Sequence, residues 1–208
     1  MERAMVFIDL NNVSSDYRLV TNGDCMEITS YLDKIAAMFP ELSIRRNHVF
    51  LTETGSNGGF ITYLQHIPNT KVTLGRLQSK SVYLVNRGGE YESANGVSSA
   101  TVEMRTDKKT DSNLIVKMLV DAFNDNYDTA ILISRDADFV PAVEAVQNLG
   151  KRVELVLFEG VQNIAQELSM AVDDIKVISS DEYNSISKQP SERTVMAEKL
   201  SNITCEVA

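Results

Sequence analysis

Two apolar, strand-like runs in this chain end on acidic residues. The first, Met5–Ile8, leads directly into Asp9, and the second, Ala130–Ser134, is soon followed by Asp136 and Asp138. Their nearly continuous apolar character is typical of strands buried on both faces, as in a parallel sheet covered by helices. Because parallel sheets build their sites at the carboxyl ends of the strands, the pattern predicts that these acids crowd one edge.

Crowded carboxylates need a counter-charge. Each nearby like charge raises the free energy of the ionised forms unless a cation or a shared proton intervenes. Mg²⁺ prefers oxygen ligands and keeps several waters, so an aspartate cluster with few His or Cys suits it better than zinc. The two cysteines, Cys25 and Cys205, form no zinc-binding or disulfide pattern, and we expect a reducing, cytoplasmic location.

The spacing of apolar and turn residues predicts an α/β chain of alternating strands and helices. In the first part we expect a helix over 28–39, a strand at 49–51, a short helix over 61–67 and a strand at 71–74, with polar residues but no assigned helix over 11–23. Later we expect helices at 111–122, 139–149 and 164–170, and strands at 131–133, 153–157 and 176–178. Such alternation implies parallel strands joined by right-handed crossovers.

The middle of the chain interrupts this alternation. We interpret 81–107 as a β-rich basic insertion, in which 81–85 and 90–92 form a hairpin and 100–104 adds an edge strand. We therefore expect one domain over 1–184, including this insertion. A polar C-terminal tail would follow over 185–208, with one helix near 191–200.

Charge is distributed unevenly along the chain. The formal net charge of -9 argues against a protein that coats nucleic acid by charge alone. The stretch from Lys71 to Lys109 nevertheless carries seven basic residues and four acids, a net of +3 that leaves -12 elsewhere. This stretch either balances its neighbours or borders the acidic edge and binds a polyanion. No segment approaches a membrane span, and the apolar run before Asp9 is too short for a signal peptide.

Each acid also has a structural interpretation. Asp9 can accept hydrogen bonds from the loop that follows it, and Asp111 and Asp138 each precede a predicted helix, where aspartate is a common N-cap. The functional interpretation depends on convergence, because these acids and Asp136 all fall where a parallel sheet presents its carboxyl edge and its helix N-termini. Helix dipoles at that edge also stabilise ionised carboxylates.

Around these acids the chain contains three motif-like segments, Phe7–Val13, Lys109–Leu114 and Tyr127–Pro141. In order and spacing they resemble the motifs of the NYN domain family, a branch of the PIN-like nucleases, over about Met5 to Ser179. The resemblance implies a three-layer α/β/α sandwich with a central, mostly parallel, Rossmann-like sheet, to which we add the β-hairpin insertion. It also implies an acidic, Mg²⁺- or Mn²⁺-dependent site that cuts RNA. The matching site positions are the metal-site acids Asp9, Asp111, Asp136 and Asp138, with Asn12 and Ser134 beside them.

Two basic residues depart from the family pattern. Lys117 stands where many relatives have an acid, and Arg135 where they usually have a small residue. Lys117 is either a solvated helix position or a change in the charge of the site, for which Asp121 does or does not compensate. Arg135 can contact phosphate, pair with a neighbouring carboxylate or obstruct the site. These departures motivate an alternative function, a weakly active or non-catalytic RNA-binding or regulatory module of the same fold.

The main hypothesis is a metal-dependent endoribonuclease acting on single-stranded or looped RNA. The basic residues that would bind the substrate are Arg76, Arg87, Lys108, Lys109 and Arg135. Tyr83 and Tyr91 either stack on bases or pack between strands. This chemistry needs no histidine base, and we expect His48 and His66 to be packing or surface residues.

Two other enzyme classes fit the sequence less well. A haloacid-dehalogenase-type phosphatase needs a second Asp where this chain has Asn11. A dinucleotide-binding enzyme needs a glycine-rich turn after the first strand, and Leu10–Val13 contains no glycine. Self-association into a homo-oligomer is left open.

Overall fold

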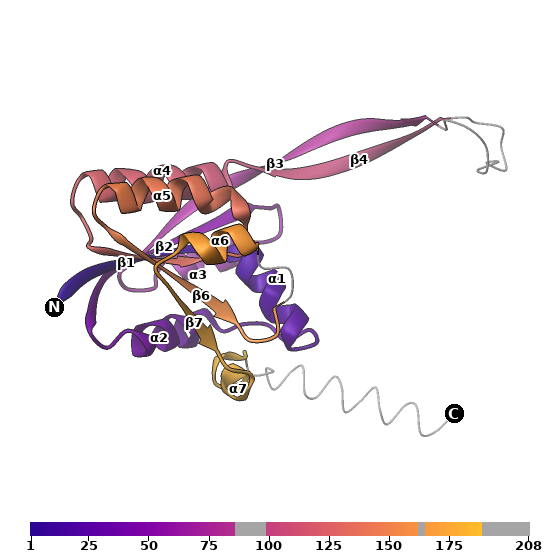
Figure 1. The fold of residues 1–208 in the computed structure, drawn as a ribbon. Coiled ribbons are helices and arrows are strands. Elements are labelled where there is room, and N and C mark those ends of the chain that lie inside the picture. The colour runs from indigo at the N-terminus through magenta and orange to yellow at the C-terminus, as the bar shows by residue number, and fades with distance from the viewer. Residues whose placement is uncertain (86–98, 162–164, 189–208) are drawn as a thin grey trace, which may run out of the picture.

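The computed structural model describes residues 1–85, 99–161 and 165–188, with side chains described outside 79–107. A seven-stranded sheet of order β4-β3-β2-β1-β5-β6-β7 lies between two layers of helices (Figure 1). The strands are β1 (Glu2–Asp9), β2 (Leu42–Glu53), β3 (Thr70–Val85), β4 (Ser99–Lys108), β5 (Thr129–Ile133), β6 (Arg152–Phe158) and β7 (Asp174–Ile178). All pair in parallel except β4, which runs antiparallel to β3. The predicted α/β sandwich is confirmed.

The helices divide between the two faces of the sheet. They are α1 (Leu10–Val20), α2 (Ile28–Met38), α3 (Gly58–Gln65), α4 (Thr110–Phe123), α5 (Val140–Asn148), α6 (Gln166–Ala171) and α7 (Tyr183–Ile186). Residues of α1, α2, α3 and α7 form one buried cluster, and residues of α4, α5 and α6 form the other. None of these helices, in the part of the chain that the structure describes, is long and apolar enough to cross a membrane.

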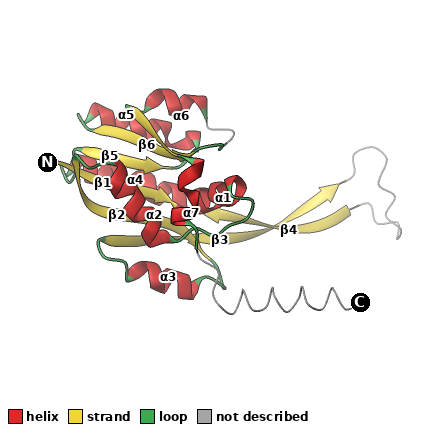
Figure 2. Cartoon of the chain, turned by 90° about the horizontal axis from the view of Figure 1, so that it is seen from below, coloured by secondary structure: helices red, strands yellow, loops and turns green. Residues whose placement is uncertain are grey.

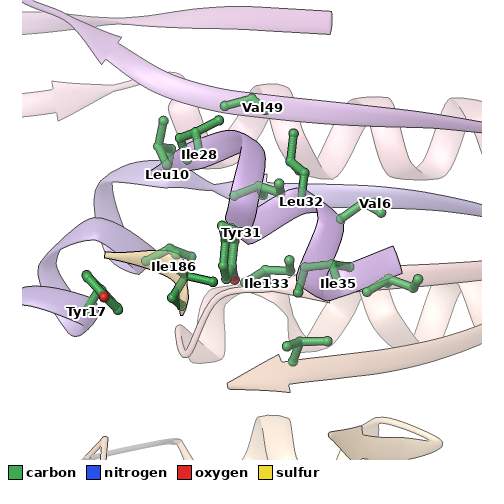
Figure 3. Packing of buried hydrophobic residues seen from close by; sticks show 14 of the residues in the cluster. Val6, Leu10, Tyr17, Ile28, Tyr31, Leu32, Ile35, Val49, Ile133 and Ile186 are labelled. Carbon is green, nitrogen blue, oxygen red and sulfur yellow. The ribbon is translucent and has the colours of Figure 1, made fainter. Parts of the chain in front are cut away.

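Alternation along the strands supplies both clusters. In β1, Val6 and Ile8 join the cluster beneath α2, while Phe7 points to the other face. Figure 3 shows Tyr31 and Leu32 of α2 packed over the sheet in the first cluster. Complete burial of side chains of this size stabilises the fold by roughly 1.5–3 kcal/mol each. The continuous apolar strands of the sequence are therefore explained by a sheet covered on both sides.

The strand order reverses between β1 and β5. The chain moves outward from β1 to β2 and β3, and then α4 returns it to β5 on the other side of β1. The carboxyl ends of β1 and β5 are level, since Ile8 pairs with Ile133, the last residue of β5, while β2 continues past Phe50, the partner of Asp9, to Glu53. In open α/β sheets a ligand site forms outside the carboxyl ends of the strands at such a switch point.

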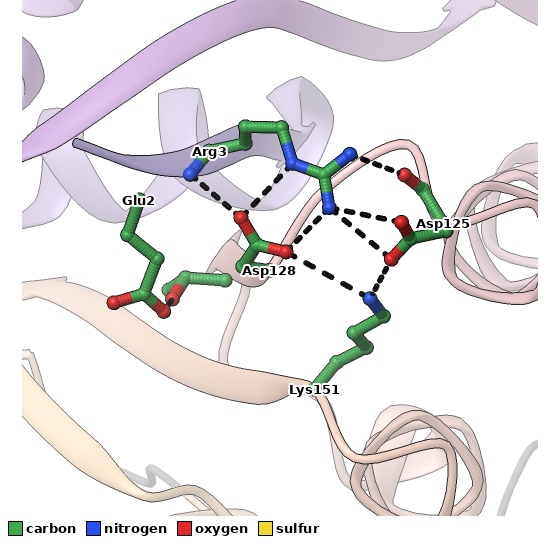
Figure 4. A network of polar contacts seen from close by, with 6 residues as sticks. Glu2, Arg3, Asp125, Asp128 and Lys151 are labelled. Atoms are coloured by element: carbon green, nitrogen blue, oxygen red, sulfur yellow. Dashed lines mark hydrogen bonds and ion pairs between the residues drawn. The ribbon is translucent and has the colours of Figure 1, made fainter.

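A network of ion pairs links the amino-terminal ends of the central strands, at the end of the sheet opposite to Asp9 (Figure 4). The Arg3 guanidinium donates to the Asp128 carboxylate, with Nε to Oδ2 at 3.0 Å, and to the backbone carbonyl of Asp125 at 2.6 Å. Lys151, in the turn before β6, pairs with Asp125. The hydrogen bonds from Arg3 hold the pKa of Asp128 well below its usual range. The starts of β1, β5 and β6 are thus fixed at the end of the sheet remote from the predicted site.

The segment after β1 forms a helix that the sequence interpretation missed. Helix α1 occupies 10–20, and Leu10, Val13 and Tyr17 are its buried apolar residues. Their spacing of three and four residues is helical, but polar residues separate them and obscured the pattern. At the other end of the domain, Ile186 of α7 is buried in the same cluster. The helix expected near 191–200 lies outside the described residues.

The β-rich insertion is a long two-stranded ribbon. Strand β3 runs without a break from 70 to 85, where two separate strands were expected. Its first part pairs with β2 and the remainder pairs only with β4, from Arg76↔Lys108 to Val85↔Ser99. Residues 81–85 pair with 99–103 of β4, and the partner expected at 90–92 lies outside the described residues. Figures 1 and 2 show the ribbon projecting away from the sandwich.

Candidate active site

Asp9 ends β1 at the switch point of the sheet. Its side chain is only 5% exposed, and Oδ1 accepts a hydrogen bond from the backbone N–H of Asn12 at 3.2 Å, so the carboxylate caps α1. The Ser134 hydroxyl, directly after β5, donates to Asp9 Oδ2 at 3.3 Å. Both oxygens of this buried carboxylate are therefore oriented by donors from neighbouring elements.

Ser134 also joins Asp9 to the second group of acids. Its hydroxyl accepts a hydrogen bond from the backbone N–H of Asp136 at 3.3 Å. Asp136 in turn caps the 3₁₀ turn 137–139, because its Oδ1 accepts the N–H of Asp138 at 3.0 Å. The N-cap position that the sequence suggested for Asp138 belongs to Asp136 instead, and Asp138 is exposed in the first turn.

Asp111 lies at the same edge on the first turn of α4. It is exposed, and α4 begins one residue earlier, at Thr110, so Asp111 is not the N-cap either. A chain of polar contacts positions this helix end. Thr110 Oγ1 lies 3.4 Å from Thr52 Oγ1 of β2, and the Asn11 amide donates to that same Thr52 oxygen at 2.7 Å. The starts of α1 and α4 are thereby linked across the end of β2.

The acidic residues at this edge match the ligand preference of a hard divalent cation, but they do not gather into a group of ligands around one point. Among the residues that the structure describes, no three Asp, Glu, His or Cys side chains form a group that could hold a metal. Mg²⁺, however, is commonly held by one or two carboxylates together with waters and substrate phosphates. Asn12 Oδ1, three residues after Asp9, is buried without a hydrogen-bond partner. Such an acceptor suits a cation or a water bound to one, and the oxygen-only donor set suits Mg²⁺ or Mn²⁺.

The two basic residues that depart from the family pattern both form ion pairs. Lys117 Nζ lies 2.7 Å from Oδ1 of Asp121, one turn further from the acidic edge. Arg135 Nε lies 3.1 Å from Oδ1 of Asp16 on α1. Burial raises the pKa of Asp16, and the charge of Arg135 opposes that rise. Of the three possibilities for Arg135, the structure shows the pairing with a carboxylate.

Basic residues border Asp111 at the base of the ribbon. Arg76 and Lys108 are exposed and directly paired across β3 and β4, an arrangement of like charges that a bound anion stabilises. Lys109 is exposed between β4 and α4, and its φ of 79° lies in the left-handed region that few non-glycine residues adopt. The predicted substrate contact Arg87 lies outside the described residues.

Sequence reasoning missed the polar residues that support this edge. Thr52 and Thr110 are both buried, and Asp16 is the buried partner of Arg135. The one available signal was position, since Thr52 directly follows the apolar run Val49–Leu51 just as Asp9 follows Met5–Ile8. Asp16 gave no signal, because its partner lies far away in the sequence.

Comparisons with known proteins agree on the fold. The family model described as the NYN domain matches residues 3–181, nearly the whole chain. The structure is similar to the crystal structure of a protein of unknown function from Vibrio parahaemolyticus, with a TM-score of 0.59 and 17% sequence identity over 90% of this chain and 96% of that one. At this identity the similarity shows the fold alone. No curated protein matches the chain.

Proposed function

The chain belongs to the NYN domain family, whose members are generally ribonucleases, and we propose that it is a metal-dependent endoribonuclease. One observation carries the proposal. The buried carboxylate of Asp9 is joined through Ser134 to Asp136 where the strand order reverses, which is where parallel sheets place their active sites.

The acids at this edge have distinct roles in the proposal. Asp9 and Asp136 would hold the metal, and Asp111 and Asp138, exposed at the same edge, would act on it through its bound waters. A bound Mg²⁺ or Mn²⁺ supplies Lewis-acid polarisation of the scissile phosphodiester and of the attacking water. Ser134 keeps the Asp9 carboxylate oriented, so that its charge needs no rearrangement when substrate arrives.

Single-stranded or looped RNA is the proposed substrate. Arg76 and Lys108 at the base of the ribbon, together with Lys109, place positive charge beside Asp111 and bind the RNA backbone. Asp121 and Asp16 balance the charges of Lys117 and Arg135, so we do not expect these two basic residues to weaken catalysis.

Metal-dependent cleavage of an end-labelled single-stranded RNA tests this function. We expect cleavage with Mg²⁺ or Mn²⁺, none with EDTA, and a loss of at least about 100-fold in Asp136→Asn, because the removed charge stabilises the metal and the transition state. The matched control is Asp33→Asn, which changes an exposed aspartate on α2, and it should cleave like the parent. Cleavage that survives EDTA or Asp136→Asn contradicts the proposal. Tight RNA binding without cleavage favours the alternative, an RNA-binding module of the same fold.

A further inference from the structure

A pocket of about 430 Å³ lies beside the acidic edge, between α1 and the start of α3, and we call it the α1–α3 pocket. Its lining includes Leu10, Ser14 and Arg18 of α1, Leu51 of β2 and Phe60 of α3. Apolar, hydroxyl and cationic groups therefore meet in one concave site. A volume in the range of a few hundred cubic ångströms is typical of small-ligand sites.

The α1–α3 pocket adjoins the candidate active site through the start of α1. Leu10 directly follows Asp9, and Asn11, another lining residue, bonds to Thr52 at the acidic edge. A chain bound across the acids can therefore place a neighbouring unit in this pocket. The proposed metal-dependent cleavage does not itself use this pocket.

Phe60 gives the pocket an aromatic surface. Its side chain is 40% exposed and lines the pocket, so the ring is open to a ligand there. The ring stacks on Tyr63 with centroids 6.4 Å apart and an interplanar angle of 26°. The Tyr63 hydroxyl donates to Glu27 Oε1 at 2.7 Å, so the stacked pair is anchored to the cap of α2. A fixed, exposed ring of this kind is a platform on which a planar ligand can stack.

Arg18 gives the pocket a positive charge. It is exposed on α1 and makes no ion pair with any residue that the structure describes. Its guanidinium is thus available to bind a phosphate, for which its donor geometry is well suited. Ser14 and Ser15 add hydroxyl groups that can donate to or accept from the polar edge of a ring.

We propose that the α1–α3 pocket binds one unpaired nucleobase of the RNA, with the base stacked on Phe60 and an adjoining phosphate on Arg18. An unpaired base presents a flat π-face and a polar edge next to a phosphate, and the pocket offers a matching group for each. The inference rests on the proposed function, because it takes the RNA that crosses the acidic edge as its ligand. It adds a site that selects single-stranded over duplex RNA.

Binding in EDTA, where no cleavage occurs, isolates this site. The probe is a short fluorescein-labelled single-stranded RNA of mixed sequence, measured by fluorescence anisotropy beside an otherwise identical abasic strand. We expect Phe60→Ala to weaken binding of the base-containing strand about 5- to 100-fold and to leave the abasic strand unaffected, since stacking requires the base. Arg18→Gln should weaken both strands and reduce the salt slope by about one. The matched control, Phe123→Ala, removes an exposed phenylalanine from the distant end of α4 and should bind like the parent.

The other outcomes test the pocket and the proposed nuclease separately. Equal loss for both strands in Phe60→Ala would assign Phe60 a role in shape rather than in stacking. Unchanged RNA binding together with a concentration-dependent dimer that Phe60→Ala dissociates would make the pocket an interface with a second copy of the chain. Phe60-dependent binding without metal-dependent cleavage by the parent leaves the pocket standing and rejects the nuclease. Cleavage with Phe60-independent binding does the reverse, and absence of RNA binding by the parent rejects the pocket.

Discussion

Protonation of His48 should destabilise the fold. The ring lies on β2, is 1% exposed and stacks on Phe7 with centroids 5.3 Å apart. Burial, and then the charge of Lys117, lower the pKa of His48, while Asp121, 3.4 Å from Nε2, opposes both, and the resulting pKa is about 4. His48 is therefore neutral in the folded protein at pH 7, as the sequence expectation of a packing residue requires.

The size of the effect follows from the difference between the folded and unfolded pKa values. The unfolded chain has a histidine pKa of about 6.5 and the folded protein one of about 4, a difference that corresponds to about 3 kcal/mol. Between about pH 6.5 and pH 4 the unfolded state binds more protons than the folded state. The free energy of unfolding therefore falls as the pH is lowered through this window, by about 2 kcal/mol at pH 5 from His48 alone.

Urea unfolding at about pH 7.5 and pH 5 measures this contribution. His48→Gln removes the titrating ring, and its free energy of unfolding should fall between the two pH values by about 2 kcal/mol less than that of the parent. His66→Gln is the matched control, because His66 is exposed on α3's C-terminal side, and it should follow the parent. Equal pH dependence of the parent and His48→Gln would refute the reasoning.

Three further predictions address the edges of the sheet. Ser134→Ala removes the hydroxyl that donates to Asp9; we expect it to cost about 1–2 kcal/mol in urea unfolding and to lower the RNA cleavage rate at least tenfold, and an unchanged rate would contradict the positioning role. Lys109→Gly relieves a left-handed φ; it should stabilise the fold by about 1 kcal/mol while it weakens RNA binding and reduces the salt slope by about one, so the two measurements should move in opposite directions. Asp128→Asn removes the carboxylate that Arg3 binds. Because the pKa of this carboxylate is lowered in the folded state, the parent should lose stability as the pH falls below about 4. Thermal melts should show a smaller loss for the variant over the same pH range.

The sequence was sufficient to predict the central sheet and the acids at its edge. Val6, Ile131 and their neighbours form continuous apolar runs because helices cover both faces, and that cause leaves a direct trace in the sequence. Asp9 and Asp136 follow these runs, so the strand direction places them together. The predicted helix start after Lys109 added Asp111, whose edge position the start of α4 supports.

Other features depend on contacts that sequence periodicity does not encode. Helix α1 buries only a narrow apolar stripe of Leu10, Val13 and Tyr17, and the polar residues between them weaken its periodic signal. The pairing of Lys117 with Asp121 follows the four-residue spacing of a helix, so it was predictable. The pairing of Arg135 with Asp16 needed the packing of α1 against the sheet next to the segment that follows β5, which only the tertiary structure supplies.

The ribbon of β3 and β4 has a consequence for how the molecule opens. Beyond Arg76 the ribbon pairs only with itself, and an isolated two-stranded ribbon is marginally stable in water. Its amide hydrogens should exchange with solvent through local separation of the two strands, while those of β1 require the whole sandwich to unfold. The protein should therefore show two classes of exchange rate, with denaturant accelerating only the slower one strongly. An RNA bound at the base of the ribbon would slow amide exchange in the ribbon at concentrations that leave exchange in the core strands unchanged.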